Sequence, residues 1–476
     1  MTARPFYPAL VICTILLSAH AGVDLPSPLA LQAGDLKLDG GLVPVAQLVN
    51  DQDDADVAYS TASSQYLVVF EDPGNNGDIL GQFVDAKSGE LIGGWFYIAV
   101  SAGQEYYPAV VYDDYQDRFL VVWQRNYCLS NWCYFIIEGR LVYGSYQGTN
   151  NWAGNVFEIA NGHQPTNAGI DMVYPSAAYN ADEHQYVVVY QKGYFSTGNF
   201  QSIYGQMIRS DASSPEVLTG VSAGFEVASN GSDIQVKYPD VAWSREGGSF
   251  LVVWQQFWPN KTDKIIGRYL YDTFQGTGKT QVHGTGGYVI APVFAMGNVP
   301  NVDEYNDPAV TFDANNNNFV IAFTHTEITG LIYSNRIYAA RLKDAFENSA
   351  QNVGNPFPVE ATLNVNYTGH YAPDVVYSGL DGETFIVYVS NYFDQGNDFA
   401  QVNARVLRGA DVSERFMVHT APLGLAIKEP GAAGTNNGTA LVVWDEEYFT
   451  DPYDWDIHGQ RIKSYSKVYL PSVMKE

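Results

Sequence analysis

The sequence predicts an all-β protein, a seven-bladed β-propeller of four-stranded antiparallel blades. Two observations lead to this fold: a short apolar run returns seven times, and no segment shows the spacing of an amphipathic helix. Runs of this length, rich in β-branched and aromatic residues, are typical of strands that are buried on both faces. The seven copies are YLVVF (66–70), FLVVW (119–123), YVVVY (186–190), FLVVW (250–254), FVIAF (319–323), FIVYV (385–389) and ALVVW (440–444).

Each apolar run has companions at fixed places. An alternating strand precedes it, as in PAVVY (108–112) and PDVAW (239–243), and a polar hairpin turn joins the two. A third strand with a small residue at its fourth position follows, as in SIYGQMI (202–208), and then a looser fourth strand such as FEVA (225–228). Seven such units predict a propeller, because one blade alone cannot bury both faces and must stack on its neighbours.

The predicted ring also has to be closed. The seventh unit ends near Ile462 without a regular fourth strand, whereas GLVPVAQLVN (41–50) has the pattern of a fourth strand that belongs to no unit. We expect this N-terminal segment to complete the last blade, because a paired latch strand removes an open sheet edge. The alternative latch is the C-terminal SKVYLP.

The repeated cycle of P-x-V-x-[YW], [YF]-LVVW-Q and I-x-G-[QR] resembles the repeats of secreted bacterial seven-bladed propellers of largely unassigned function. The resemblance covers residues 42–462 and implies the architecture without implying an activity. The chain lacks the S-x-D-x-G-x-x-W box of sialidases and the D-x-D-x-D-G calcium loop of integrin-type propellers.

The N-terminus has the pattern of a secretory signal. Arg4 precedes an apolar run from Ala9 to Leu17, and small residues allow cleavage after Ala21. The run is too short for a membrane span, and no later stretch is long and apolar enough for one. We therefore expect an exported chain without a membrane span, divided into a signal peptide (1–21), a linker (22–40), the propeller (41–462) and a C-terminal tail (463–476).

The chain is strongly acidic. Its formal net charge is −27, and removal of the signal takes away one arginine and no acid. Such a surface repels nucleic acid and anionic lipid, and it suits divalent cations, basic partners or neutral glycans. Many of the acidic residues are also explained by solubility alone.

Cys128 and Cys133 are the cysteines that remain after the signal. In an oxidising compartment, two cysteines this close are expected to form a local disulfide. Closing so short a loop contributes about 2 kcal/mol, which stabilises a loop but does not hold a domain together.

Function is expected at one face of the propeller, where the connections between second and third strands and between blades emerge together. The second-to-third connections are rich in aromatic residues, which suit the apolar faces of sugars or a protein interface. They could equally fold inward and cover the blades. The candidate ligand-binding residues are Trp132, Tyr194, Trp258, Tyr392, Tyr453 and Trp455.

Paired carboxylates are the one enzymatic option that the sequence supports. Two carboxylates about 5 to 9 Å apart could hydrolyse a glycosidic bond, and the same oxygens could hold Ca²⁺. The densest cation candidate is NDQDDAD (50–56). The carboxylates expected at the ligand face are Glu446, Glu447, Asp451, Asp454 and Asp456 in the last unit, and Asp303, Glu304 and Asp307 before the fifth.

These observations favour an exported, non-catalytic binding or scaffold module that recognises extracellular glycan or a protein partner through the aromatic loops. The alternative is a polysaccharide-degrading enzyme, a glycosidase or lyase, that uses carboxylates on the same face. No cofactor is expected from the sequence, although its clustered carboxylates could hold Ca²⁺, and nucleic acid is excluded as a partner.

Overall fold

The computed structural model describes residues 36–464, apart from 49–50, 76, 130–131, 149, 163–168, 195–198, 211–215, 219–223, 230–233, 258–262, 272–280, 283–287, 292–303, 330–331, 344–354, 361–366, 381, 395–396, 410 and 448–454. The chain separates into Met1–Ala33 and Gly34–Glu476, and the described residues all belong to the second unit. Their secondary structure consists of β-strands and one 3-10 turn, η1 (Pro73–Asn75).

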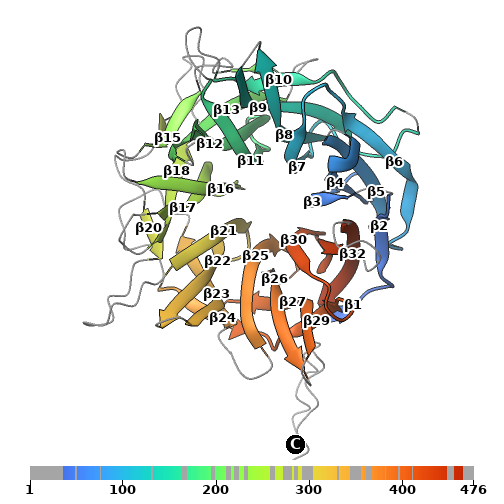
Figure 1. Cartoon of the computed structure of the whole chain (residues 1–476), viewed down its shortest axis with the longest axis vertical. Helices are drawn as coiled ribbons and strands as arrows, with labels where there is room; N and C mark the ends of the chain where they lie inside the picture. The colour runs from blue at the N-terminus through green and yellow to red at the C-terminus, as the bar shows by residue number, and fades with distance from the viewer. Residues whose placement is uncertain are drawn as a thin grey trace, which may run out of the picture. The chain divides into compact units, whose positions relative to one another are not determined.

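Seven antiparallel sheets stand around a central opening, which confirms the predicted propeller (Figure 1). Each sheet is one blade, and its strands follow the order of the sequence from the opening outward, except that the outermost strands of the last blade come from the N-terminal segment. The first three blades are β3 (Asp53–Ser60), β4 (Gln65–Asp72), β5 (Asp78–Asp85) and β6 (Leu91–Ala99); β7 (Glu105–Asp113), β8 (Arg118–Leu129), β9 (Trp132–Tyr143) and β10 (Phe157–Ala160); and β11 (Asp171–Asn180), β12 (Gln185–Tyr194), β13 (Asn199–Arg209), β14 (Glu216–Val217) and β15 (Phe225–Ser229).

The remaining blades repeat this order. In blades 3, 4 and 6 the fourth strand is split into two short segments that pair with the same third strand. Blades 4 to 7 are β16 (Gln235–Ser244), β17 (Ser249–Phe257), β18 (Lys264–Tyr271), β19 (Gln281–Val282) and β20 (Tyr288–Ala291); β21 (Glu304–Asp313), β22 (Asn318–Thr329), β23 (Ile332–Lys343) and β24 (Phe357–Glu360); β25 (Tyr367–Tyr377), β26 (Glu383–Asp394), β27 (Asn397–Arg408), β28 (Asp411–Val412) and β29 (Phe416–Thr420); and β30 (Ile427–Gly434), β31 (Thr439–Glu447) and β32 (Trp455–Ser464).

The N-terminal segment closes the ring, as the sequence predicts. Strand β2 (Val43–Ala46) pairs antiparallel with β32, with Val43 opposite Gly459. A second short strand, β1 (Leu36–Leu38), also pairs with β32 and lies in the stretch that the sequence assigns to a linker. Because β32 would otherwise be an open edge, this pairing completes the last blade.

The core lies between blades and is built from the seven apolar runs. Each run falls in the second strand of its blade, and in blade 1 its members Leu67, Val68 and Val69 are fully buried. The small residue of the third strand lets the fourth strand approach closely. A Cβ atom added at Gly205 would lie 2.5 Å from the ring of Phe225 on β15. The small-residue position is therefore a packing requirement.

The segments expected to be second-to-third loops are largely strand in three blades. Strand β8 continues to Leu129 and β9 begins at Trp132, so most of 124–135 belongs to a long hairpin. Strands β22 and β23, and β26 and β27, extend in the same way. Alternating polar and aromatic residues, which a loop does not require, pair across these hairpins and carry the ladder beyond the core.

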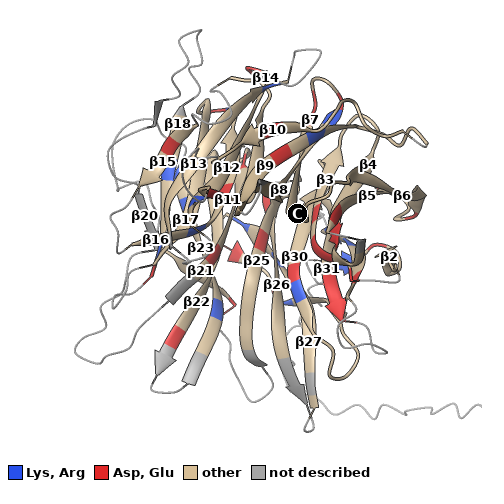
Figure 2. Cartoon of the chain, turned by 45° about the horizontal axis from the view of Figure 1, so that its top comes forward, with Lys and Arg blue, Asp and Glu red and all other residues tan. Residues whose placement is uncertain are grey.

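Inner strands β3, β7, β11, β16, β21, β25 and β30 surround the opening, and each contacts the next around the ring (Figure 1). Asp and Glu residues occur on several of them, including β25 and β30 (Figure 2). In the described part of the chain, no helix is long and apolar enough to cross a membrane.

Candidate functional site at the central opening

The inner strand of every blade carries a β-bulge at the same place. In six blades the bulge residue precedes a proline, which has no N–H and therefore fits where the ladder is interrupted. The left-handed conformation costs a non-glycine residue about 1–2 kcal/mol, and such strain gathers at functional sites. Six bulge residues adopt it, with φ between 48° and 53°: Asp54, Tyr107, Tyr174, Tyr238, Asp307 and Ala372.

The preceding blade holds the bulge in place in four cases. The acceptor is the residue that directly follows the apolar run, and its side chain accepts a hydrogen bond from the backbone N–H of the bulge residue. This contact explains the glutamine that ends several copies of the repeat. The acceptor and donor pairs are Gln124 and Tyr174 (2.9 Å), Gln191 and Tyr238 (2.6 Å), Glu71 and Tyr107 (3.3 Å), and Asp445 and Asp54 (3.0 Å).

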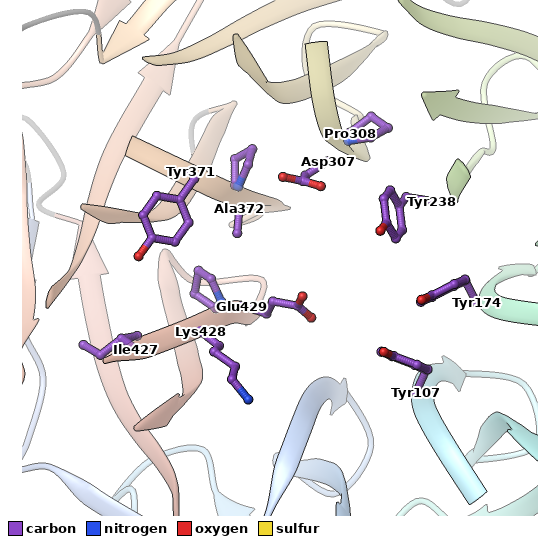
Figure 3. Close-up of a pocket in the computed structure, with 12 residues that line it drawn as sticks. Tyr107, Tyr174, Tyr238, Asp307, Pro308, Tyr371, Ala372, Ile427, Lys428 and Glu429 are labelled. Atoms are coloured by element: carbon purple, nitrogen blue, oxygen red, sulfur yellow. The ribbon is translucent and has the colours of Figure 1, made fainter. Parts of the chain in front are cut away.

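The bulge residues line a cavity of about 550 Å³ in the central opening (Figure 3). An adjoining space of about 220 Å³ shares Tyr107, Tyr174, Tyr238 and Glu429 with it and adds Asp54. Because the two share these walls, we treat them as one central pocket. Its side chains come from inner strands of all seven blades, so the propeller fold alone brings them together.

Three tyrosines from successive blades form one wall of the central pocket. The ring centroids of Tyr107 and Tyr174 lie 4.6 Å apart, and those of Tyr174 and Tyr238 lie 5.2 Å apart. Burial raises the pKa of Tyr238 to about 12, and burial together with the charge of Asp54 raises the pKa of Tyr107 further. The phenols therefore stay neutral and can donate and accept hydrogen bonds.

Carboxylates line the rest of the pocket, with Glu429 across from the tyrosines and Asp307 next to Tyr238 (Figure 3). Burial raises the pKa of Asp307 to about 6. Desolvation inside the opening, followed by the charges of Asp307 and Asp53, raises the pKa of Glu429. Burial and several neighbouring acids, Glu71 first, hold the pKa of Asp54 well above its usual value. These groups resist losing their protons because burial in the opening desolvates the charged form.

One acidic cluster beside the pocket has a geometry that could hold a cation. One oxygen each from Asp53, Asp54 and Asp445 lies within 4.8 Å of the others, so part of the predicted NDQDDAD candidate is assembled with a residue of blade 7. Lys428 Nζ lies 2.9 Å from Asp53 Oδ2 and supplies one positive charge there. Ca²⁺ prefers six to eight oxygen ligands, and these three carboxylates supply part of that number.

The described aromatic side chains among those predicted from the loops, Trp132, Tyr194 and Trp455, are not part of the pocket lining. Trp132 and Tyr194 are exposed, with 59% and 47% of their surface accessible. The ring of Trp455 is half-buried and lies 3.7 Å from Lys428 Nζ, so it borders the pocket through that lysine. Tyr392 lies in β26, but its side chain is outside the described residues, as are Trp258 and Tyr453.

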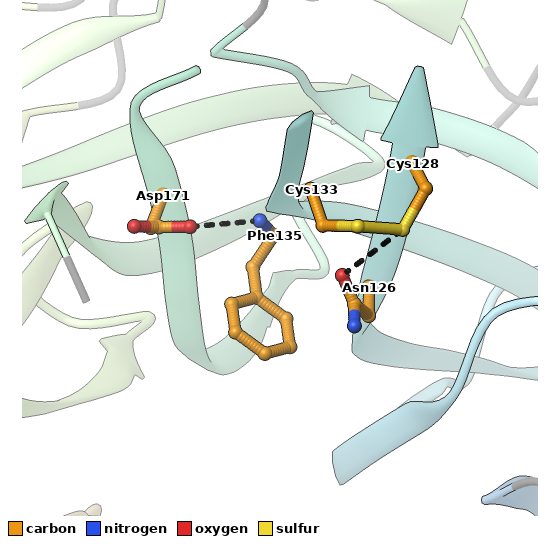
Figure 4. The surroundings of a disulfide bond; sticks show 5 residues. All are labelled: Asn126, Cys128, Cys133, Phe135 and Asp171. Atoms are coloured by element: carbon orange, nitrogen blue, oxygen red, sulfur yellow. Dashed lines mark hydrogen bonds between the residues drawn. A yellow bond between two sulfur atoms is a disulfide. The ribbon is translucent and has the colours of Figure 1, made fainter. Parts of the chain in front are cut away.

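The predicted disulfide is present. Cys128 and Cys133 are bonded and lie opposite each other in the β8–β9 ladder (Figure 4). At the base of this hairpin the backbone N–H of Phe135 donates to Asp171 on the neighbouring blade at 2.9 Å. The bond therefore holds together the strands that present Trp132.

Of the predicted carboxylates, Asp307 lies in the central pocket. Glu446 is buried and accepts hydrogen bonds from Trp444 Nε1 at 3.1 Å and His419 Nε2 at 2.8 Å, which is a structural role. Glu447 accepts from the backbone N–H of Ala426, and Asp456 is buried. Asp303, Asp451 and Asp454, and the side chain of Glu304, lie outside the described residues.

Sequence reasoning missed the three pocket tyrosines and Glu429. The signal was present, because each directly precedes a proline at the same place in its repeat. That position varies among Tyr, Asp, Ala and Glu while the motif around it stays regular. Variation at one position of a regular repeat was therefore the feature that marked the pocket.

No family model matches the chain, and no curated protein matches its sequence. Among solved structures, an ulvan lyase from a new family of polysaccharide lyases (PL25), bound to a saccharide of GlcA and Rha3S, matches with a TM-score of 0.53 and 10% identity over 88% of this chain and 95% of that chain. A second structure of that lyase gives 0.50 and 10% over 89% and 94%.

The β-propeller domain of the Trilobed protease from Pyrococcus furiosus matches with a TM-score of 0.39 and 12% identity over 90% of this chain and 99% of that chain. At 10% identity, the likeness to the lyase shows a shared fold and nothing of the chemistry. The seven-bladed fold predicted from the repeats is thus confirmed, and membership of the secreted bacterial family stays a prediction.

Proposed function

We propose that the protein binds a saccharide in its central pocket. One observation carries this proposal: the same bulge position in three successive blades places three tyrosine rings side by side, with Asp307 next to Tyr238 and Glu429 across from the rings (Figure 3). Sugars present apolar C–H faces that pack on aromatic rings and hydroxyls that donate to carboxylates. A pocket with mixed apolar and polar walls suits such a ligand.

A longer glycan would continue onto the surrounding face. Trp132 and Tyr194 are exposed on the ends of β9 and β12, and Trp455 stands beside the pocket lysine. These residues would supply further stacking positions, as the sequence predicts. The disulfide supports placing the protein outside the cell, because such bonds persist in oxidising compartments.

The propeller that gives the highest of these TM-scores belongs to a polysaccharide lyase, so the fold is compatible with glycan recognition. Its bound saccharide contains GlcA, an acidic sugar, and Rha3S. The central pocket here is itself acidic, so we do not carry that ligand over to this chain.

The test is retention of the purified protein on a panel of immobilised polysaccharides, with and without a chelator. We expect retention on at least one member, and weaker retention for Tyr174→Ala. The matched control is Tyr143→Ala, which removes an exposed tyrosine at the far end of β9. Absence of retention on every member would contradict the proposal and favour a protein partner or a scaffold.

A second candidate is a polysaccharide-degrading enzyme. The observation that favours it is the raised pKa of two carboxyls in one pocket, Asp307 and Glu429. A carboxyl whose pKa lies near 6 can serve as a general acid close to neutral pH, and a second carboxylate can act as base or nucleophile. Asp307→Asn and Glu429→Gln would then each abolish turnover while the fold is preserved. Retention of a polysaccharide without any cleavage would favour the binding protein.

A further inference from the structure

We infer that the saccharide bound in the central pocket carries an ammonium group, as an amino sugar with a free amine does; this inference rests on the proposed function. The starting point is the charge of the pocket. Asp54, Asp307 and Glu429 line it, and Lys428 is the only basic residue in the described lining. Lys428 Nζ already lies 2.9 Å from Asp53 Oδ2. The pocket therefore keeps an excess of negative charge.

Two pocket carboxylates have no protein partner. Within the described residues, neither Asp307 nor Glu429 accepts a side-chain hydrogen bond or forms an ion pair. Glu429 points toward the tyrosine wall, and Asp307 borders the same space (Figure 3). By contrast, Asp374 on β25 accepts two backbone N–H groups, those of Val375 and Ala432, both at 2.7 Å. The two pocket carboxylates are thus available to a ligand.

Deeper acids strengthen the negative potential without being available themselves. Asp56, Asp240 and Asp374 lie two residues beyond the bulge on their inner strands, and each accepts a backbone N–H from another blade at 2.7–2.8 Å. Burial, followed by the charges of Asp240 and Asp56, raises the pKa of Asp374 to about 7. Lys237 precedes Tyr238 in the sequence, but its ammonium lies 5.7 Å from the ring of Phe257 and is not part of the pocket lining. A site surrounded by one sign of charge favours ligands of the opposite sign.

The tyrosine wall also suits a cation. An ammonium group over an aromatic face gains about 0.5–2 kcal/mol, more as it is desolvated. A neutral sugar would cover Asp307 and Glu429 and leave their charge uncompensated, which is costly. A uronate would add a like charge to the pocket. Of the three saccharide classes, the one with a free amine is complementary to both walls.

Protonation should be linked to binding. The pocket carboxyls lose their protons reluctantly because burial disfavours their charged form, and a bound ammonium would stabilise that form. Binding should therefore release protons and weaken as the pH falls through about 6, the pKa of Asp307. The charged or titratable groups that act on Asp54, Asp307 and Glu429 are Asp53, Glu71, Asp445, Lys428 and the pocket tyrosines.

The experiment is isothermal titration of the purified protein with matched oligosaccharides of equal length: chito-oligosaccharide with free amines, its N-acetylated form, cello-oligosaccharide and a polyuronate fragment. A lysine tetramer serves as a cation that is not a sugar. The variants are Asp307→Asn and Glu429→Gln. The control is Asp114→Asn, an exposed acid on the hairpin between β7 and β8.

We expect the free-amine oligosaccharide to bind about tenfold or more tightly than its N-acetylated form, with that preference lost in both pocket variants and kept in the control. Equal or tighter binding of the acetylated or neutral sugar would overturn the inference and leave saccharide binding intact. Tighter binding of the lysine tetramer would overturn the choice of a sugar. Absence of binding by any oligosaccharide would overturn the proposed function and this inference together.

Discussion

The bulge residue is the position at which the seven blades differ most in side-chain chemistry. The same backbone position holds Tyr in blades 2, 3 and 4, Asp in blades 1 and 5, Ala in blade 6 and Glu in blade 7. The strand around it must satisfy the blade-to-blade packing, whereas this side chain faces the opening and is free to vary. A ligand in the opening would therefore contact bulge residues from several blades rather than a single loop.

Tyr174→Ala should weaken saccharide binding by roughly 1–3 kcal/mol, the size expected for an aromatic anchor. Tyr174 is the middle ring of the wall and contacts both neighbouring tyrosines, so its loss removes two ring contacts as well as the surface for the ligand. Affinity measured by titration checks this, with Tyr143→Ala expected to change nothing. Equal losses in the two variants would show that the wall is structural.

Ala372 tests whether the bulge is strained. Its φ is 48°, a left-handed value that costs alanine about 1–2 kcal/mol and glycine almost nothing. Against this, glycine lowers the stability of the fold by about 0.5–1 kcal/mol relative to alanine, because the unfolded chain gains conformational freedom. Ala372→Gly should therefore be neutral or stabilise the fold by up to about 1 kcal/mol, seen as an unchanged or higher thermal midpoint. The control Ala404→Gly, in buried β27, should lower the midpoint. A lower midpoint for both would argue against strain at the bulge.

At the scale of the strand, the repeat allowed most of the fold to be predicted. The apolar runs can be recognised in the sequence because both faces of the second strand are buried. The latch could be predicted because the last unit lacks a fourth strand. The long β8–β9 hairpin was not predicted, since its residues leave the core and their polar and aromatic pattern also fits a loop. The disulfide was predicted from two close cysteines, but that it clamps a ladder was not.

The latch strand makes an element-scale prediction. Val45 on β2 is 3% exposed and packs into the core between the last and first blades. Val45→Ala should cost about 2 kcal/mol, from lost apolar burial and the cavity left behind. Thermal unfolding checks the cost, and faster proteolysis of the N-terminal segment would show that the latch has opened. Leu42→Ala, at an exposed neighbour, should stay within about 0.5 kcal/mol of the parent. Equal effects of the two would mean that β2 does not hold the ring.

At the scale of the whole molecule, the ring explains why the pocket could not be predicted. Asp54, Tyr107, Tyr174, Tyr238, Asp307 and Glu429 come from six different blades and meet only when the circle closes. Repeat analysis gives the blade and its order but not which side chain faces the axis, because that depends on a bulge that shifts the register by one residue. Asp307 was named for its acidic neighbourhood, and the structure places it in the pocket.

The same arrangement concentrates carboxyl groups with raised pKa values in one molecule. Burial is the main cause in every case. Their protonated form is favoured by the fold, whereas in the unfolded chain they ionise near pH 4. Between about pH 4 and pH 7 these carboxyls are therefore ionised in the unfolded chain but still protonated in the folded protein. The free energy of unfolding falls as the pH rises through this range. The groups are Asp56, Asp78 and Asp307 at about 6, and Glu71, Glu105 and Asp374 at about 7.

We therefore expect the thermal midpoint to be higher near pH 5 than near pH 8. Acids with lowered pKa values, such as Glu360 beside Arg405, act in the opposite direction, but their contribution is lost only as the pH falls below the unfolded value near 4.5. Glu105 is fully buried, so Glu105→Gln should increase the free energy of unfolding at pH 8 by up to about 3 kcal/mol and raise the thermal midpoint there. At pH 5 the same substitution should change both quantities little. A midpoint that rises from pH 5 to pH 8 would contradict this account. It would indicate that a bound cation holds these carboxylates in their ionised form, and a chelator should then lower the midpoint at pH 8.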